Sequence, residues 1–374
     1  MANKPVHYNE GGFPPKRINW DRLIPLLGPA SAALARYDGT LAAIPNSALL
    51  LSPLMTQEAV LSSRIEGTQA TMGEVLEYEA GVSPMPADPE RTADIQEVLN
   101  YRQAMWRAVD LLTELPLCQR LLKETHKVLM EGVRGQNKSP GEYRKIQNWI
   151  GPPRTPIEKA TYVPISSEKL PEAMSQWEHF IHKDAPDKLV QLAILHAEFE
   201  ALHPFLDGNG RLGRMFVPLF LFSEKLIRSP VFYISAYMEA RRDVYYGKLL
   251  EISKSDEWTS WCSFFLEAIA EQAEENRQKA EAILKLYEKE RTRFVDLTHS
   301  QHAIEALDFL FMRPIFQASA FTIESGIPRA TANRILKTLR DNGLFRVIRQ
   351  SEGRKPAVLA FRELLNIAEG REVF

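Results

Sequence analysis

The stretch HPFLDGNGRLGR, residues 203–214, decides how this chain folds and what it can do. Asp-Gly and Asn-Gly favour hairpins where alternating strands flank them. Here the flanks, LVQLAILHAEFEAL (189–202) and RMFVPLFLFSEKL (214–226), carry apolar residues at helical spacing. Because Pro204 disfavours helix at His203, the stretch is predicted to be a loop between two buried helices.

The glycines and arginines of this loop have the properties of an anion-binding site. A helix start offers unpaired backbone N–H groups and the positive end of the helix dipole. Gly208 and Gly210 let this backbone approach a ligand closely and adopt positive φ. Arg211 and Arg214 lie three residues apart on one helical face, and guanidinium groups suit phosphate oxygens. The loop therefore predicts a phosphate cradle.

Asp207 and His203 add a metal ligand and a base. A carboxylate beside a polyphosphate is explained by Mg²⁺ between them, because Mg²⁺ completes its shell with phosphate and water. His203 takes up a proton near neutral pH. One alternative is a polar turn whose arginines pair with nearby acids. A weaker one is a metal-binding face formed by His196, Glu200 and His203. The sequence lacks the GxxxxGK[ST] pattern of P-loop nucleotidases.

Residues 203–214 resemble the Fic signature, His-x-Phe-x-[Asp/Glu]-Gly-Asn-Gly-Arg-x-x-Arg, and match it at every defined position. The resemblance extends over about residues 90–285, and the layout is similar to bacterial Fic proteins with an N-terminal inhibitory helix and a C-terminal winged helix. It implies transfer of AMP from ATP to a Tyr, Ser or Thr hydroxyl of a target protein or of the chain itself. ATP as substrate and Mg²⁺ as cofactor follow from the same resemblance.

The resemblance also implies a role for each residue of the loop. His203 would deprotonate the target hydroxyl, and Phe205 would anchor the loop in the core. The remaining roles are a metal contact by Asp207, a phosphate cradle of Gly208, Asn209 and Gly210 with Asn209 at the α-phosphate, Arg211 at the β-phosphate and Arg214 at the γ-phosphate.

A second motif, SSRIEG at residues 62–67, lies upstream. Ser62 and Glu66 are four residues apart, on one face of a predicted helix that Gly67 ends. A carboxylate at a helix C-terminus is disfavoured by the helix dipole unless a cation pairs with it, and Arg214 is a candidate for that cation. The string resembles the family's inhibitory motif, [Ser/Thr]-x-x-x-Glu-[Gly/Asn]. By that resemblance Glu66 pairs with Arg214 in the place of the γ-phosphate and holds the enzyme inactive.

We expect a mainly α protein, a Fic-type helical core with a β-hairpin flap and a C-terminal winged helix-turn-helix. The expected regions are an N-terminal helical region with the inhibitory helix at 1–95, a Fic catalytic domain at 96–290 and a winged helix-turn-helix domain at 300–374. Thr56 is predicted to cap the inhibitory helix, and Thr71 with Glu74 to form a capping box on the next one. SPMPADPE, residues 83–90, is predicted to be a loop.

Residues 141–166 interrupt the helical pattern with prolines and two short β-prone pieces. We expect a flap whose residues 147–165 pair with an extended target peptide as an added strand. A plain structural hairpin is the alternative. Further along, Tyr245 and Tyr246 are expected near the adenine, as a tyrosine at about this point is in relatives, with core packing as the alternative.

The tail carries a concentration of positive charge. Between residues 328 and 362 it has nine cations and two acids, against a net charge of −2 for the whole chain. A basic stripe of this kind indicates a surface for phosphate backbones. The helix predicted in IPRATANRILKTLRDNGL (327–344) would present Arg329, Thr331, Asn333, Arg334 and Lys337 outward. Both DNA binding and protein contact remain open for it.

The bulk composition indicates a soluble cytoplasmic protein of 374 residues. Its two cysteines, Cys118 and Cys262, have no metal-binding spacing. The N-terminus has no apolar signal region, and Pro218 interrupts the most apolar stretch, residues 215–222. We therefore expect no membrane partner, and family resemblance makes a homodimer the expected assembly.

Two rival functions remain. One is a Fic enzyme that transfers another nucleotide, or that removes AMP while Glu66 positions a water. The other is a DNA-binding regulator whose Fic core senses nucleotide without turnover. The intact His203 argues against a pure sensor, because a sensor needs no base.

Overall fold

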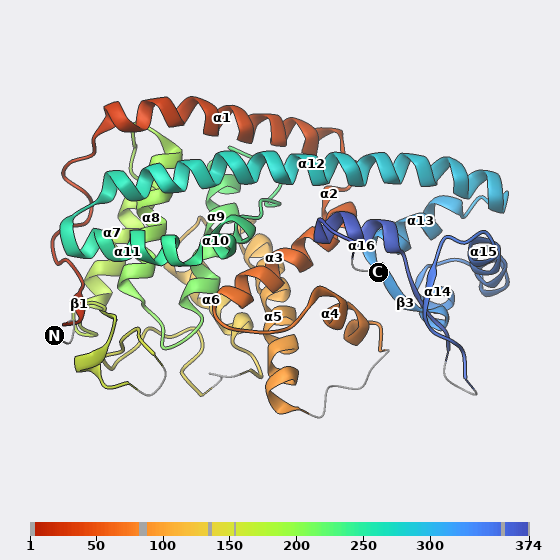
Figure 1. Ribbon diagram of the computed structural model, residues 1–374, viewed down its shortest axis with the longest axis horizontal. Helices are drawn as coiled ribbons and strands as arrows, with labels where there is room; N and C mark the ends of the chain where they lie inside the picture. The colour runs from red at the N-terminus through yellow and green to blue at the C-terminus, as the bar shows by residue number, and fades with distance from the viewer. Residues whose placement is uncertain (1–3, 82–87, 134–136, 153–154, 353–355, 373–374) are drawn as a thin grey trace.

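The computed structural model of the chain is mainly α-helical, as the sequence predicts, with small sheets at two places (Figure 1). It describes all residues except 1–3, 82–87, 134–136, 153–154, 353–355 and 373–374. Most of the predicted loop at 83–90 lies outside the described residues. Within the described part, no helix combines the length and the apolar character needed to cross a membrane.

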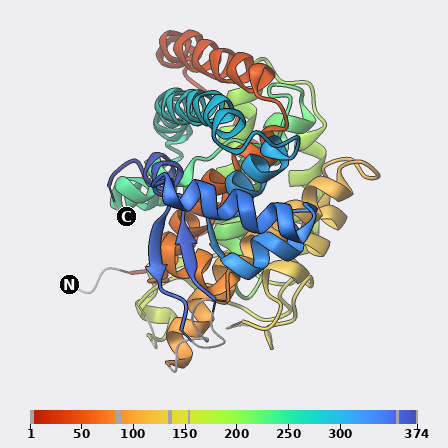
Figure 2. The same cartoon turned by 90° about the vertical axis from the view of Figure 1, so that its right-hand side faces the viewer.

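Two long helices run side by side along the longest axis of the molecule (Figures 1 and 2). They are α1, Trp20–Ala43, and α12, Trp258–Thr298. The predicted helical run over 240–290 is broken at Asp256, whose φ is 59°, and α11 (Arg242–Ser255) precedes the break. Because α12 also packs on α13, α15 and α16, it links the catalytic region to the tail.

Five helices surround the loop, and two of them, α8 and α9, are buried on nearly all sides. The five are α5 (Pro89–Leu111), α6 (Gln119–Leu129), α7 (Leu170–Ile181), α8 (Lys188–Leu202) and α9 (Asn209–Ser223). Asp187 caps α8 by accepting from the backbone N–H groups of Leu189 and Val190. Residues 189–200 are all buried, the pattern of a central core helix.

The helix with the second motif, α3 (Ser52–Ile65), packs against α5, α9 and α10 (Ser235–Ala240). It follows the short α2 (Ser47–Leu50) and precedes α4 (Met72–Glu79). The expectation that Thr56 caps α3 is wrong. Thr56 lies inside the helix, which begins a turn earlier because Pro53 suits the first turn. The capping box of Thr71 and Glu74 on α4 is present.

Leaving aside residues 153–154, the described part of the flap contains less strand than predicted. Its hairpin consists of one antiparallel bridge, Ile150 to Tyr162, and a 3₁₀ turn at Ile157–Lys159. The short strand β2 (Tyr162–Val163) pairs in parallel with β1 (Val6–His7) of the N-terminal arm. The arm is held further by Tyr8, whose hydroxyl donates to the buried Glu198 at 2.5 Å.

The tail follows the order helix, strand, helix, helix, strand, strand, helix. Its elements are α13 (Ala303–Met312), β3 (Ile315–Gln317), α14 (Ala318–Glu324), α15 (Arg329–Asp341), β4 (Arg346–Arg349), β5 (Val358–Ala360) and α16 (Arg362–Glu369). The antiparallel sheet has the order β3-β5-β4. These elements include three helices followed by a hairpin, the order that the sequence suggests for a winged helix-turn-helix, and they add β3 and α16. The sequence SEGRKP, residues 351–356, is expected to form the wing tip, and its residues 353–355 lie outside the described residues.

The tail packs directly on the region that contains α3. Helix α13 contacts α2 and α3, and α16 contacts α3. The predicted region boundaries fall inside helices, since α5 spans residues 95 and 96 and α12 spans residue 290. The division into three regions therefore stays a prediction.

Candidate active site

The loop between α8 and α9 is fixed by two left-handed residues and an asparagine. His203 ends α8 with a φ of 46°, and Gly208 precedes α9 with a φ of 74°. The Asn209 side chain closes the loop on the fully buried Phe205, accepting from its N–H at 2.8 Å and donating to its carbonyl at 2.9 Å. The loop thus uses the amide oxygen and one amide hydrogen of Asn209, so its second amide hydrogen and its backbone N–H remain as donors for a ligand.

His126 on α6 holds the loop from outside. Its ring stacks on Phe205 with centroids 3.8 Å apart. Its Nδ1 accepts from the Gly141 N–H at 2.8 Å, so the Nε2–H donates to the Asp207 carbonyl at 2.9 Å. Burial lowers the pKa of His126 to about 4, so this neutral tautomer persists at physiological pH. No local pattern in the sequence marks this contact, because His126 lies 81 residues before Asp207.

His203 is neutral and available as a proton acceptor. Its backbone carbonyl is held by the Arg144 Nε–H at 3.0 Å. Its Nδ1 is buried and has no hydrogen-bond partner among the described residues. Burial lowers the pKa of His203 to about 4, although the charge of Glu66 acts in the opposite direction. The side chain is therefore a neutral imidazole beside the loop.

Asp207 is an ionised carboxylate surrounded by cations. Its Oδ1 accepts from the Gly208 N–H at 2.7 Å, and its Oδ2 lies 2.9 Å from Lys138 Nζ. Arg211 Nη2 lies 3.6 Å from Oδ1. Burial would raise the pKa of Asp207, but the Lys138 hydrogen bond and the Arg211 charge outweigh it and leave the pKa below its ordinary value. Asp207 is thus ready to bind a cation.

The two arginines of α9 are buried, and each is paired with a glutamate from the N-terminal part of the chain. Arg211 Nη1 lies 2.9 Å from Glu97 Oε2 on α5. Arg214 Nη2 lies 2.7 Å from Glu66 Oε1, at the end of α3. Burial would lower the pKa of Arg214, but the charge of Glu66 raises it, so the guanidinium remains charged. A buried guanidinium needs such a partner.

Helix α3 brings Ser62 and Glu66 together on Arg214. The Ser62 Oγ accepts from Arg214 Nε at 2.9 Å, and the Ser62 carbonyl accepts from Nη2 at 2.7 Å. A Cβ built on Gly210 would collide with Glu66 Oε1. The Glu66 carboxylate therefore lies against the glycine backbone at the start of α9, where the sequence predicts an anion.

Two family models match the chain, and together they cover more than half of it. A Fic/DOC family N-terminal model matches residues 24–110, and a Fic/DOC family model matches residues 116–221. The chain belongs to the Fic/DOC family. Glu66 and Glu97 lie in the first matched segment, whereas the Fic loop, residues 203–214, lies in the second.

Known proteins agree with this assignment. A protein adenylyltransferase Fic of Drosophila grimshawi is 26% identical over 158 residues, which are 40% of this chain and 29% of that protein. The chain thus aligns with less than a third of that relative's length. A Fic family protein from Desulfovibrio desulfuricans has the same fold with a TM-score of 0.59 and 19% identity, over 93% of this chain and 98% of that chain. A Fic domain containing signaling protein from Bacteroides thetaiotaomicron gives a TM-score of 0.52 and 17% identity, over 69% of this chain and 97% of that chain.

Of the two tyrosines expected near adenine in this Fic protein, Tyr245 is fully buried. The His196 Nδ1–H donates to the Gly213 carbonyl at 3.0 Å, so its Nε2 accepts from the Tyr245 hydroxyl at 3.0 Å. Tyr246 is 38% exposed and lies near enough to Glu66 and Arg214 for their charges to affect its pKa. Tyr245 is thus packed in the core, whereas Tyr246 reaches the surface near Glu66 and Arg214.

The metal-binding face weighed for His196, Glu200 and His203 has no support from the geometry. His196 uses both ring nitrogens within the core. The carboxylate of Glu200 lies against Gly213, and burial raises its pKa to about 7. Within the described part of the chain, no group of three or more His, Cys, Asp or Glu side chains is arranged to hold a metal ion.

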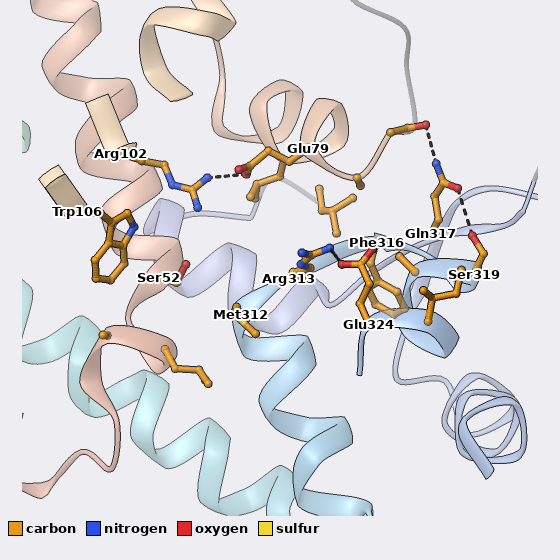
Figure 3. A pocket seen from close by; sticks show the side chains of 18 of the residues that line it. Ser52, Glu79, Arg102, Trp106, Met312, Arg313, Phe316, Gln317, Ser319 and Glu324 are labelled. Carbon is orange, nitrogen blue, oxygen red and sulfur yellow. Dashed lines mark hydrogen bonds and ion pairs between the residues drawn. The ribbon is translucent and has the colours of Figure 1, made fainter. Parts of the chain in front are cut away.

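A cavity of about 830 Å³ lies elsewhere, between α4 and α5 on one side and α13, β3 and α14 on the other (Figure 3). Arg102 pairs with Glu79 on one wall, and Arg313 pairs with Glu324 on the other. None of its lining residues belongs to the Fic loop. The chemistry of the loop, rather than the size of this cavity, identifies the candidate active site.

Proposed function

We propose that this Fic protein transfers AMP from ATP to a Tyr, Ser or Thr hydroxyl of a target protein, and of itself, and that Glu66 holds it inactive. In the reaction the hydroxyl oxygen bonds to the α-phosphorus, the bond from that phosphorus to the bridging oxygen breaks, and pyrophosphate leaves. The imidazole of His203 takes the hydroxyl proton, which its depressed pKa of about 4 leaves it free to do at neutral pH.

Buried donors without acceptors support binding of a polyphosphate. Arg211 Nε and Arg214 Nη1 are buried and have no hydrogen-bond partner among the described residues. Both lie on α9, whose first turn supplies backbone N–H groups at Asn209 and Gly210. Unpaired buried donors are costly, so such groups fit a missing anionic ligand.

The surroundings of Asp207 fit Mg²⁺ shared with phosphates. Among the described residues no larger group of acidic side chains surrounds Asp207, and a single ionised carboxylate suits Mg²⁺, which keeps water and phosphate oxygens in its shell. When bound, the ion would neutralise charge on the phosphates. Lys138, now paired with Asp207 Oδ2, would give up this contact.

The observation that carries the proposal is the position of Glu66. Its carboxylate lies on Arg214 and against Gly210, so an anion already occupies the end of the cradle. A γ-phosphate competing for Arg214 would meet this carboxylate, and like charges repel. Glu66 therefore acts as a built-in competitor for the γ-phosphate.

The test is incorporation of label from α-labelled ATP with Mg²⁺ by purified Glu66→Gly protein, followed by mass spectrometry. We expect AMP on a hydroxyl residue, a rate well above that of the unmodified chain, and loss of this signal in Glu66→Gly/His203→Ala. Glu224→Gly is the matched control, since Glu224 ends α9 and pairs with Lys188 away from the loop. Equal labelling by the Glu66→Gly and Glu224→Gly proteins would contradict the inhibitory role.

The same preparation separates the rival enzyme activities. Labelled GTP, CTP and UTP in place of ATP test transfer of another nucleotide. Release of AMP from a pre-labelled protein, compared between the unmodified chain and Glu66→Gly, tests removal. Faster release by the unmodified chain would favour a role of Glu66 in positioning water.

Exposed apolar side chains support target binding by the flap. Ile146, Trp149 and Ile150 are all exposed, and Asn148 between them donates to the Phe205 carbonyl at 3.2 Å. The flap is thus tied to the Fic loop beside His203. Its segment 147–150 is the edge that we propose for an extended target peptide.

A second function, DNA binding by the tail, is favoured by the charges of α15. Arg329, Lys337 and Arg340 are exposed and form no ion pair with any residue that the structure describes. A DNA-binding regulator with a nucleotide-sensing core is the corresponding rival to the enzyme. We also propose a homodimer in the cytoplasm, which sedimentation velocity and cell fractionation test.

A further inference from the structure

The two arginines of α9 differ in which part of the guanidinium is occupied. On a guanidinium, Nε and Nη2 share one edge, the edge that binds an oxyanion with two parallel hydrogen bonds. On Arg214, Ser62 and Glu66 take both atoms of this edge. On Arg211, Glu97 takes Nη1, the atom outside this edge. The edge of Arg211 is thus left for a ligand.

The remaining contacts of Arg211 agree with an open edge. Its Nε has no hydrogen-bond partner among the described residues. Its Nη2 lies 3.6 Å from Asp207 Oδ1 and 3.9 Å from Met130 Sδ, which is a weak acceptor. Nη2 therefore lies on the side of the loop that contains Asp207, where the proposed metal and phosphates belong, and Nε shares its edge of the guanidinium.

The two glutamates differ in how easily they can leave. The Glu66 side chain is 33% exposed and ends α3 just before Gly67, whose φ is 106°. The Glu97 side chain is 6% exposed and lies inside α5, which packs on α3, α6 and α9. Glu66 can turn into solvent, whereas Glu97 cannot leave Arg211 without moving a core helix.

We propose that Glu97 is a positioning residue, which holds Arg211 by Nη1 so that its Nε–Nη2 edge binds the β-phosphate. This inference rests on the proposed function. It makes Glu97 the permanent counterpart of Glu66: one glutamate directs an arginine toward the nucleotide, and the other keeps an arginine away from it. Their removal should have opposite effects on the enzyme.

A comparison of ADP with AMP tests the proposal without any turnover. In the Glu66→Gly chain, the Kd values of Mg-ADP and AMP are measured by calorimetry with and without Glu97→Gln. The amide keeps the volume but loses the charge that fixes Nη1. We expect Kd for ADP to rise by roughly tenfold to a hundredfold, the usual worth of a hydrogen bond to a charged group. Kd for AMP, which has no β-phosphate, should stay within about twofold of its starting value.

Two further variants separate positioning from loss of structure. Arg211→Met should weaken ADP binding selectively, and Glu97→Gln added to it should have little further effect, because both changes act on one contact. Glu97→Asp, which keeps the charge, should recover part of the ADP affinity. Thermal unfolding of each variant checks that the fold is intact.

Unchanged ADP affinity in a folded Glu97→Gln chain would overturn the proposal, and so would equal losses for ADP and AMP. Failure of the proposed transfer reaction gives a different result. In that case the Glu66→Gly chain would incorporate no label, while the ADP and AMP affinities would still report on Glu97.

Discussion

Helices α9 and α15 both carry arginines at helical spacing, but the burial and pairing of these arginines differ. On α9, Arg211 and Arg214 are at most 3% exposed, and each is paired with a glutamate from a distant part of the chain. On α15, Arg329, Lys337 and Arg340 point into solvent, and no ion pair with the described residues involves them.

This difference in burial decides how specific a ligand can be inferred from an arginine. Burying a guanidinium is unfavourable unless partners are provided, so a buried arginine with an unused donor indicates a specific anion of defined geometry. An exposed cation is fully hydrated, so its position on the surface costs little free energy. It indicates only that a partner, if there is one, is negatively charged. The Fic loop therefore supports a reaction, whereas α15 supports a class of partner.

The largest expected contrast between the two helices is in stability. Arg211→Ala removes the guanidinium that pairs with the buried Glu97 and should lower the free energy of unfolding by about 3–5 kcal/mol. Lys337→Ala on α15 should change it by less than about 0.5 kcal/mol, since the side chain is exposed. Urea unfolding followed by circular dichroism measures both. Similar losses for the two variants would mean that α15 is part of the packed core.

The second contrast concerns salt. If the cations of α15 contact a phosphate backbone, binding of a labelled DNA duplex should weaken steeply between 50 and 200 mM salt, by roughly tenfold or more for a few phosphate contacts. Lys337→Ala and Arg340→Ala should each reduce the slope of log K against log salt by about one. Fluorescence anisotropy with a duplex of arbitrary sequence measures this. Weak DNA binding whose affinity does not change with salt concentration would favour the protein-contact role of the tail.

Much of the candidate site was predictable because its residues are adjacent in sequence. Pro204 and the apolar flanks locate the loop, and the spacing of Arg211 and Arg214 puts them on one helical face. The capping box at Thr71 was predictable for the same reason, since both partners lie within one turn. Local rules of this kind need no knowledge of the tertiary structure.

Contacts made across the fold were not predictable in this way. Glu97 meets Arg211 over 114 residues, and Lys138 meets Asp207 over 69. In the sequence Glu97 is one acid among many on an amphipathic helix, and nothing local marks its burial. The start of α3 was misplaced for a related reason, because Thr56 is a good cap but Pro53 allows an earlier start.

A third prediction concerns pH and again depends on burial near α9. Burial lowers the pKa of His203 to about 4, below the ordinary value of 6.5. The base therefore stays neutral as the pH falls from 7.5 to 5.5, and is protonated only as the pH passes through about 4. For Glu66→Gly we expect kcat/KM to fall by less than about twofold over that range, against roughly tenfold for a base of ordinary pKa. A tenfold loss with an intact circular dichroism spectrum would show that His203 is hydrated in the active protein.

The smallest predicted effect concerns the first residues of two helices, α4, which has a side-chain cap, and α15, which has none. Thr71 caps α4 by accepting from the Glu74 N–H at 3.3 Å, while Glu74 Oε2 accepts from the Thr71 N–H at 2.9 Å. Helix α15 follows Pro328 and has no side-chain cap. Thr71→Ala should therefore lower the free energy of unfolding by about 1 kcal/mol, and Thr331→Ala by less than about 0.5 kcal/mol.

Urea unfolding of both threonine variants, with Thr113→Ala as an exposed control, measures this difference. Equal losses at Thr71 and Thr331 would mean that packing of the buried Met72 and Val75, rather than the cap, fixes the start of α4. A larger loss at Thr331 would mean that its side chain stabilises α15 from within the first turn. In that case the outward polar face of α15, which we propose for DNA binding, would also stabilise the helix. The residues of that face would then not be explained by DNA binding alone.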